Sequence, residues 1–118
     1  MKNNNQNSTR YYSDAHEKSV CNALGGRQTA NSGAGKWKKG DVIVDKASML
    51  VECKTCMKDK DSFSIKKEWF DKNRSEAFSN RLSNQCVCFN FGPNQSNYYI
   101  INQSLMKFLI EKLEEMGD

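Results

Sequence analysis

Two short apolar segments separated by four residues constrain the fold most strongly. Residues 42–44 read Val-Ile-Val, residues 49–54 read Met-Leu-Val-Glu-Cys-Lys, and Asp-Lys-Ala-Ser lies between them. Segments rich in apolar and β-branched residues that flank a short polar stretch predict a β-hairpin. If the turn lies at residues 46–48, paired residues have numbers that sum to about 94, which places Asp41 opposite Cys53, within one residue.

Two charged side chains lie within the second apolar segment. Because successive side chains of a strand point to opposite faces, Glu52 and Lys54 share one face while Val51 and Cys53 share the other. A sheet face that packs on a core is normally apolar, so this charged pair calls for an explanation. The hairpin also brings Asp41 beside Glu52 and Lys54, which predicts a polar cluster at this end of the sheet.

A further carboxylate comes from residues 14–24, which predict a helix. Glu17 shares one face of this helix with three apolar residues at helical spacing and could supply a third carboxylate beside Asp41 and Glu52. Two or three converging carboxylates favour a hard divalent cation such as Mg²⁺. A lysine such as Lys54 can position a water or stabilise charge on a phosphate. Together with a basic loop, these residues indicate hydrolysis of a phosphodiester.

The other predicted elements complete an α/β pattern. Apolar periodicity predicts a helix over residues 65–82 and a last helix that begins at Ser104, and apolar runs predict strands over residues 86–91 and 98–102. The order is helix, hairpin, helix, hairpin, helix, without an internal repeat. This order indicates an α/β domain in which helices cover the sheet.

The length of 118 residues fits one domain with its own core. Residues 1–12 are rich in Asn and lack apolar periodicity, so we expect a flexible polar tail and a single domain over residues 13–118. No run reaches the ~18 apolar residues of a membrane span, and the N-terminus lacks the apolar segment of a secretion signal. Five cysteines without such a signal favour reduced thiols and a cytoplasmic location.

The formal charge of +4 is unevenly distributed along the chain. Residues 27–39 contain no acid and are punctuated by Gly, Ser and Asn, which predicts a basic loop that leads into the polar cluster. Such a loop can hold phosphates without reading bases. The basic residues that we expect to contact a nucleic-acid backbone are Arg27, Lys36, Lys38, Lys39 and Lys58.

The spacing of Gly40-Asp41 and Glu52-Cys53-Lys54 resembles the motif of the PD-(D/E)XK nuclease superfamily, with Gly40 where the Pro of the motif would stand. With Glu17, Ser32-Gly33 and Lys39, the pattern is similar to that of archaeal-type and phage-encoded Holliday junction resolvases. The resemblance implies a restriction-endonuclease-like mixed sheet flanked by helices.

The same resemblance implies roles for particular residues. Glu17, Asp41 and Glu52 would be catalytic and bind Mg²⁺, for which Mn²⁺ can substitute, Lys54 would be the catalytic lysine, and Ser32 would contact DNA. A polar residue on the following helix is often functional in this superfamily, and Lys66 and Lys67 are both candidates. The implied protein is a homodimer that cuts four-way DNA junctions, in the host cytoplasm if it is phage-encoded.

Plainer interpretations of the same residues stay open. Asp14 and Glu17 fit a capping box, which would make Glu17 a helix-capping residue. Asp41 follows a glycine and fits a turn. Glu52 and Lys54 could form a solvated pair, and the basic loop could be an ordinary surface loop.

Other functional classes also stay open. The chain could be a nuclease for other DNA structures, a non-catalytic DNA-binding module or a zinc-stabilised interaction module. Zinc would use four thiols, but a Cys-x-Cys pair within a strand is typical of buried thiols rather than of zinc ligands; the four residues are Cys53, Cys56, Cys86 and Cys88. We expect His16 to be exposed near the start of its helix, and Trp69 and Phe70 to belong to the core rather than to a base-stacking surface.

Overall fold

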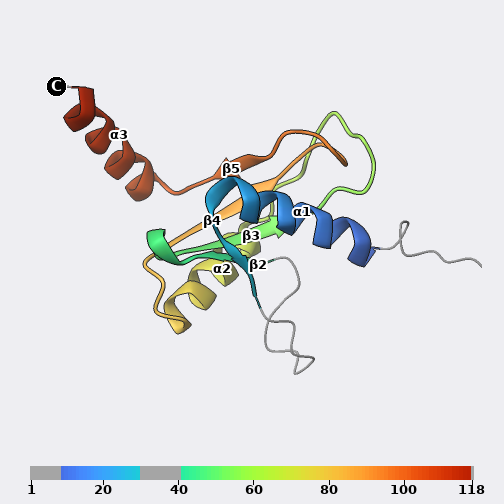
Figure 1. Ribbon diagram of the computed structural model, residues 1–118, viewed down its shortest axis with the longest axis horizontal. Coiled ribbons are helices and arrows are strands. Elements are labelled where there is room, and N and C mark those ends of the chain that lie inside the picture. Colours follow the sequence, from blue (N-terminus) through green and yellow to red (C-terminus); the bar gives the residue numbers. More distant parts are fainter. Residues whose placement is uncertain (1–8, 30–40, 118) are drawn as a thin grey trace, which may run out of the picture.

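The computed structural model describes residues 9–29 and 41–117, which form one sheet and three helices (Figure 1). The helices are α1 (Thr9–Leu24), α2 (Lys67–Ser79) and α3 (Gln103–Gly117). The strands are β1 (Arg27–Gln28), β2 (Asp41–Val44), β3 (Met49–Lys54), β4 (Asn84–Phe89) and β5 (Tyr98–Ile100). A 3-10 turn, η2 (Asp45–Ala47), joins β2 to β3. The predicted α/β fold with a mixed sheet is therefore confirmed.

The strands lie in the order β1-β2-β3-β4-β5. The predicted hairpin is present as the antiparallel β2–β3 pair, in which Asp41 lies opposite Glu52, one residue from the expected partner. β3 and β4 run parallel, whereas the other neighbouring strands are antiparallel. A parallel pair needs a crossover connection, and α2 lies within that connection.

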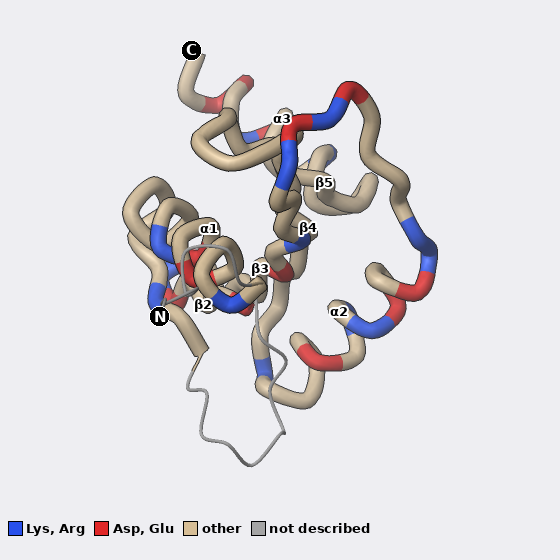
Figure 2. Tube along the Cα trace, turned by 90° about the vertical axis from the view of Figure 1, so that its right-hand side faces the viewer, with Lys and Arg blue, Asp and Glu red and all other residues tan. Residues whose placement is uncertain are grey.

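The two faces of the sheet carry different helices. Figure 2 shows α1 on one side of the strands and α2 on the other. The core on the α1 side is formed by Val20, Val42, Val44, Val51, Cys53, Cys86 and Cys88. The smaller cluster on the α2 side contains Ile43, Leu50 and Ala77. Successive residues of a strand point to opposite faces, so neighbouring residues within β2 and within β3 pack against different helices.

The first helix begins earlier than the sequence predicted. It starts at Thr9 rather than Asp14, so residues 9–12 are helical and the assignment of that part to a polar tail is wrong. Asp14 then lies inside the helix, where its carboxylate pairs with Lys18 and accepts a hydrogen bond from Gln28, so the capping-box interpretation is also wrong. Nothing in residues 9–13 breaks a helix, and the missing apolar periodicity concealed its first turn.

Glycine ends the first helix as expected. Gly25 adopts a left-handed φ of 71°, and its N–H donates to the carbonyl of Cys21. The chain then enters β1, a two-residue strand that the sequence did not reveal. The second helix is shorter than predicted, with bounds at Lys67 and Ser79.

The last helix, α3, extends away from the sheet (Figure 1). None of its residues is buried, although its sequence is amphipathic. Within the described ranges, no helix combines the length and apolar character needed to cross a membrane.

Candidate functional site

The hairpin brings two buried carboxylates together. Asp41 is fully buried and lies directly opposite Glu52, which is only 3% exposed. Both alternate with core residues of the α1 side, so they share the face that α2 covers. The ammonium of Lys54 lies 2.7 Å from Glu52 Oε2, and the lysine side chain is a quarter exposed. The pair is therefore a buried carboxylate beside a lysine that reaches the surface, not a solvated ion pair.

Helix α2 runs along this face of β3. The Trp69 ring lies 4.6 Å from Lys54 Nζ, a cation–π contact near the C-terminal end of the strand. Ala77 packs in the same cluster as Leu50, nearer the N-terminal end. The helix and the strand are thus antiparallel.

These two contacts bracket Asn73 on α2 and Glu52 on β3. Asn73 lies four residues from both Trp69 and Ala77 on one face of α2, and Glu52 lies midway between Leu50 and Lys54 on β3. Asn73 is 1% exposed. Among the described residues, neither its amide atoms nor Glu52 Oε1 has a hydrogen-bond partner. Sequence patterns indicated Lys66 and Lys67 as candidates for a functional position on this helix and carried no signal for Asn73.

This donor set fits a divalent cation. Mg²⁺ is commonly bound by one or two carboxylates, with waters and substrate phosphates completing its coordination. Asp41 and Glu52 supply two buried carboxylates on paired strands, and Glu52 Oε1 is an acceptor without a protein donor in the described part of the chain. A buried polar group of this kind is costly unless something pairs with it.

Glu17 is buried on α1, as the helical spacing predicted, but it is engaged elsewhere. Its carboxylate accepts a hydrogen bond of 2.9 Å from Gln28 Nε2 of β1. Within residues 9–29 and 41–117, no group of three or more His, Cys, Asp or Glu side chains is gathered as a metal site, so Glu17 does not complete a three-carboxylate cluster. It nevertheless lies near the hairpin, because its partner Gln28 belongs to β1, which pairs with β2.

The predicted DNA-contacting residues have different positions. Arg27 forms a bidentate ion pair with Asp45 at the hairpin turn. The Asp45 carboxylate raises the pKa of Arg27 and offsets the charge of its guanidinium. Lys58 lies on the loop after β3 and lines a cavity. The remaining predicted contacts lie outside the described residues: Ser32, Lys36, Lys38 and Lys39. On α2, Lys67 pairs with Asp71 at 3.0 Å, whereas Lys66 is the residue before the first helical turn.

A second polar cluster lies on the α1 side of the sheet. His16 is 5% exposed rather than solvent-exposed as predicted, because it shares with Glu17 and Val20 the face of α1 that packs on the sheet. Its Nδ1 lies 2.9 Å from Thr55 Oγ1, and its Nε2 lies 3.4 Å from Cys88 Sγ. Hydrogen bonds with Cys53 and His16 lower the pKa of Cys88 to about 6, whereas that of Cys53 is raised by the same thiol pair and by burial.

The cysteines do not gather as the zinc interpretation required. Cys53 and Cys88 are partners on adjacent strands and, with Cys86, belong to the core of the α1 side. Cys56 Sγ instead donates to the carbonyl of Lys58. All five cysteines are free thiols, and within the described residues they do not belong to a group of three or more His, Cys, Asp or Glu side chains that could hold a metal ion.

No known protein family, curated protein or solved structure matches this chain. The function is therefore argued from the geometry of the site.

Proposed function

We propose that the protein is a metal-dependent, structure-selective DNA endonuclease that cuts four-way junctions by hydrolysis of a phosphodiester. One observation carries the proposal: Asp41, Glu52 and Lys54 share one sheet face, with both carboxylates buried and the lysine bonded to Glu52. Two carboxylates buried side by side repel each other, and a divalent cation bound between them would relieve this repulsion. A core that served only stability would place apolar side chains here.

The residues divide the chemical work as follows. Asp41 and Glu52 would hold Mg²⁺ or Mn²⁺, whereas Glu17 lies on α1, on the other side of the sheet, where it accepts a hydrogen bond from Gln28. The ion supplies positive charge at the phosphate and a water of lowered pKa. The Lys54 ammonium donates to the phosphate or to the attacking water and offsets the negative charge of the transition state. Its contact with Trp69 restrains the lysine side chain.

The choice of substrate rests on the resemblance of the motif to that of junction resolvases. A four-way junction has two related cleavage points, so a two-fold homodimer suits it geometrically. The free thiols fit action in a reducing compartment such as the cytoplasm. Nucleases for flaps or mismatches would use the same site, and cleavage of a flap beside the junction separates the first of these alternatives.

The test is cleavage of a synthetic four-way junction in Mg²⁺, run beside a flap and a linear duplex of the same sequences. We expect cutting of the junction that requires the divalent cation and is abolished by a chelator. The near-isosteric changes Asp41→Asn and Glu52→Gln should each lower the rate at least about 100-fold, since even residues that only orient metal ligands often cost 10–100-fold. Circular dichroism verifies that each variant is folded.

The matched control is Glu111→Gln, the same change at an exposed position of α3. It should cut at the wild-type rate. If Asp41→Asn and Glu52→Gln cut as fast as this control, the assigned site is wrong. Salt-sensitive binding of DNA without cutting in any divalent cation would instead identify a non-catalytic DNA-binding module.

A further inference from the structure

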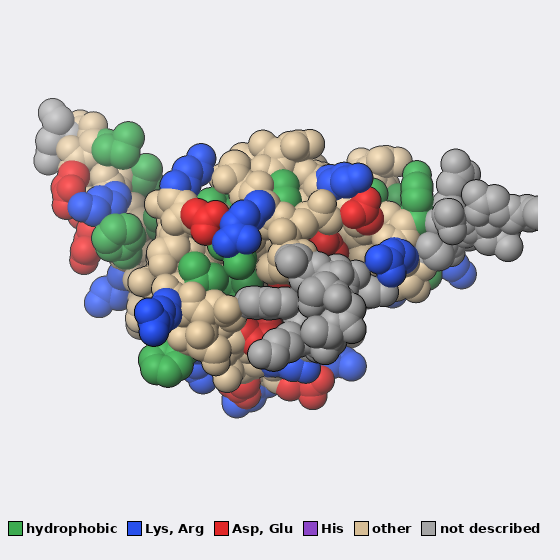
Figure 3. Space-filling model, turned by 60° about the horizontal axis from the view of Figure 1, so that its bottom comes forward, with side chains coloured by type: hydrophobic (Ala, Val, Ile, Leu, Met, Phe, Trp, Pro, Cys, Tyr) green, Lys and Arg blue, Asp and Glu red, His purple; other side chains and the backbone are tan. Residues whose placement is uncertain are grey.

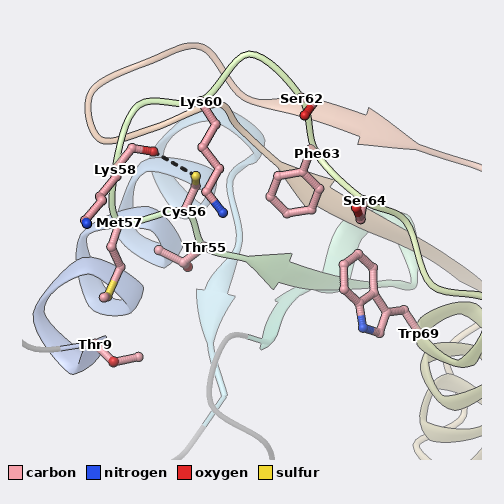
Figure 4. A pocket seen from close by; sticks show the side chains of 10 residues that line it. All are labelled: Thr9, Thr55, Cys56, Met57, Lys58, Lys60, Ser62, Phe63, Ser64 and Trp69. Atoms are coloured by element: carbon pink, nitrogen blue, oxygen red, sulfur yellow. Dashed lines mark hydrogen bonds between the residues drawn. The ribbon is translucent and has the colours of Figure 1, made fainter.

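A cavity of about 680 Å³ lies beside the proposed catalytic lysine, formed mainly by the loop that follows β3 (Figure 4). This volume is within the range of ~300–1,000 Å³ that is typical of small-molecule sites. Its walls come from the start of α1, from residues 55–64 and from α2. The lining residues are Thr9, Thr55, Cys56, Met57, Lys58, Lys60, Ser62, Phe63, Ser64 and Trp69.

One wall of the cavity is aromatic. The Phe63 ring packs on Phe89 of β4 with a centroid distance of 4.9 Å and lies 6.0 Å from Trp69 in an edge-on arrangement. Both wall residues are half-buried, so each ring is held from behind while part of it faces solvent. Rings fixed in this way offer a stacking surface at little entropic cost.

The cavity is also cationic. Figure 4 shows the ammonium of Lys60 directed inward between Cys56 and Phe63, while Lys58 extends along the opposite side. Its described lining contains no Asp or Glu. Two acids, Asp59 and Asp61, alternate with these lysines in the sequence, but neither lines the cavity, and Asp59 accepts a hydrogen bond from Gln95.

The aromatic wall connects the cavity to the proposed active site. Trp69 lines the cavity and also lies under the Lys54 ammonium, which is bonded to Glu52. A group in the cavity would therefore be a near neighbour of a phosphate that Lys54 contacts. A free metabolite could bind in the cavity without reaching Lys54. A nucleotide next to the cut phosphate must lie close to both the cavity and Lys54, which the shared Trp69 allows.

We propose that the cavity accepts one unstacked nucleotide of the DNA next to the phosphate that is cut. Its base lies against Phe63 and Trp69, its phosphate pairs with Lys60 and Lys58, and the hydroxyls of the lining are available to the base edge. The inference rests on the proposed nuclease function and adds a reason for selecting branched DNA. Bases leave the stack readily at a branch point and at little cost, whereas in a continuous duplex unstacking costs a few kcal/mol.

Binding measured without a divalent cation tests the proposal separately from cleavage. The DNA is a four-way junction with 2-aminopurine beside the branch point, compared with a linear duplex that carries the same base. We expect Phe63→Leu and Trp69→Leu, which keep apolar bulk but remove the ring, to weaken junction binding by about 5- to 100-fold. They should also abolish the change in 2-aminopurine fluorescence, while duplex affinity changes less than about twofold.

Two controls match these variants. Phe78→Leu makes the same change on α2 at a ring that is 84% exposed. Lys58→Gln with Lys60→Gln should reduce the steepness of log affinity against log salt by about 0.7 for each lysine–phosphate pair that the change removes. Lys18→Gln with Lys46→Gln makes the same change at two lysines outside the cavity and should leave this steepness as in the wild type. Thermal unfolding verifies that the variants fold.

The outcomes separate the two proposals. Equally weakened binding of junction and duplex, or weakening no greater than in the controls, would overturn the nucleotide site even if the wild type cuts junctions. Selective weakening of junction binding supports the site even if no cutting is found. If the wild-type protein binds no DNA at all, both proposals fail.

Discussion

At the scale of single residues, the site combines groups that a core normally excludes. Asp41, Glu52 and Asn73 are all nearly inaccessible to solvent. Burying groups of this kind is costly, because taking carboxylates and amides out of water carries an unfavourable free energy. Their presence on one face beside Lys54 is therefore better explained by chemistry than by folding.

Asn73 gives the sharpest test of this view. We expect Asn73→Leu, which is close in shape but apolar, to increase the free energy of unfolding by about 1–3 kcal/mol, because it removes a buried amide that has no hydrogen-bond partner among the described residues. Junction cleavage should fall by at least about tenfold, since Asn73 is buried on the helix that covers the sheet face of Glu52. Urea unfolding and the cleavage assay measure the two effects on the same protein.

Asn22→Leu on α1 is the control, because it makes the same change at an exposed position. It should leave cleavage at the wild-type rate. Lower stability of Asn73→Leu would show that the amide has partners that support the fold. Full activity in a more stable variant would remove Asn73 from the site.

Sequence patterns predicted the positions of the candidate site residues on the hairpin better than those of residues on the helices. Asp41, Glu52 and Lys54 follow from strand alternation and a short turn, which depend only on local geometry. Asn73 and His16 did not follow, because the side that a helix residue faces depends on how the helix packs against distant strands. Asn is common on exposed helix surfaces, so its type alone carried no signal.

At the scale of elements, the connection from α1 to β1 fixes how the first helix lies on the sheet. The backbone of Gly26 lies close against β2. A Cβ atom at this position would lie 2.9 Å from the carbonyl oxygen of Ile43 and 2.9 Å from Val42 Cγ1. The sequence predicted the glycines as a helix stop. It could not show this close approach, which depends on the pairing of β1 with β2.

The close approach predicts that Gly26→Ala is destabilising. The added methyl group meets backbone as well as a side chain, so the strand must shift, and we expect the free energy of unfolding to fall by about 1–3 kcal/mol. Gly117→Ala is the control, because a Cβ atom there has nothing within 4 Å. Urea denaturation measures both variants, and equal stability of the two would contradict the packing at Gly26.

At the scale of the whole molecule, the uncovered face of α3 stands out. Figure 3 shows hydrophobic side chains at the end of the molecule where this helix projects. Large apolar residues along it are 42–80% exposed: Met106, Phe108, Leu109, Ile110, Leu113 and Met116. An isolated helix of this length is marginal in water, so most of its stability must come from packing.

The charges of α3 favour an antiparallel partner helix. Glu114 and Glu115 lie near the C-terminus, where the helix dipole disfavours acids, and the last turn has no basic residue. In an antiparallel pair of identical helices, these acids lie beside the N-terminal end and Lys107 of the other copy. Met106, Leu109, Leu113 and Met116 recur at intervals of three and four residues, which suits a helix–helix seam. We therefore place the interface of the proposed homodimer at α3.

This placement predicts that Leu109→Glu and Leu113→Glu, separately or together, convert the dimer to a monomer. Sedimentation equilibrium should give twice the chain mass of 13.5 kDa for the wild type and 13.5 kDa for the variants. Phe78→Glu introduces the same kind of charge at an exposed ring of α2 and should remain dimeric. A charge at the centre of a helix seam removes the apolar burial and strips the carboxylate of its hydration, so dissociation should be complete at micromolar concentration. If the double variant Leu109→Glu/Leu113→Glu remains a dimer, the interface lies elsewhere. If the wild type is a monomer, the proposed homodimer is wrong and the apolar face of α3 does not bind a second copy of the chain.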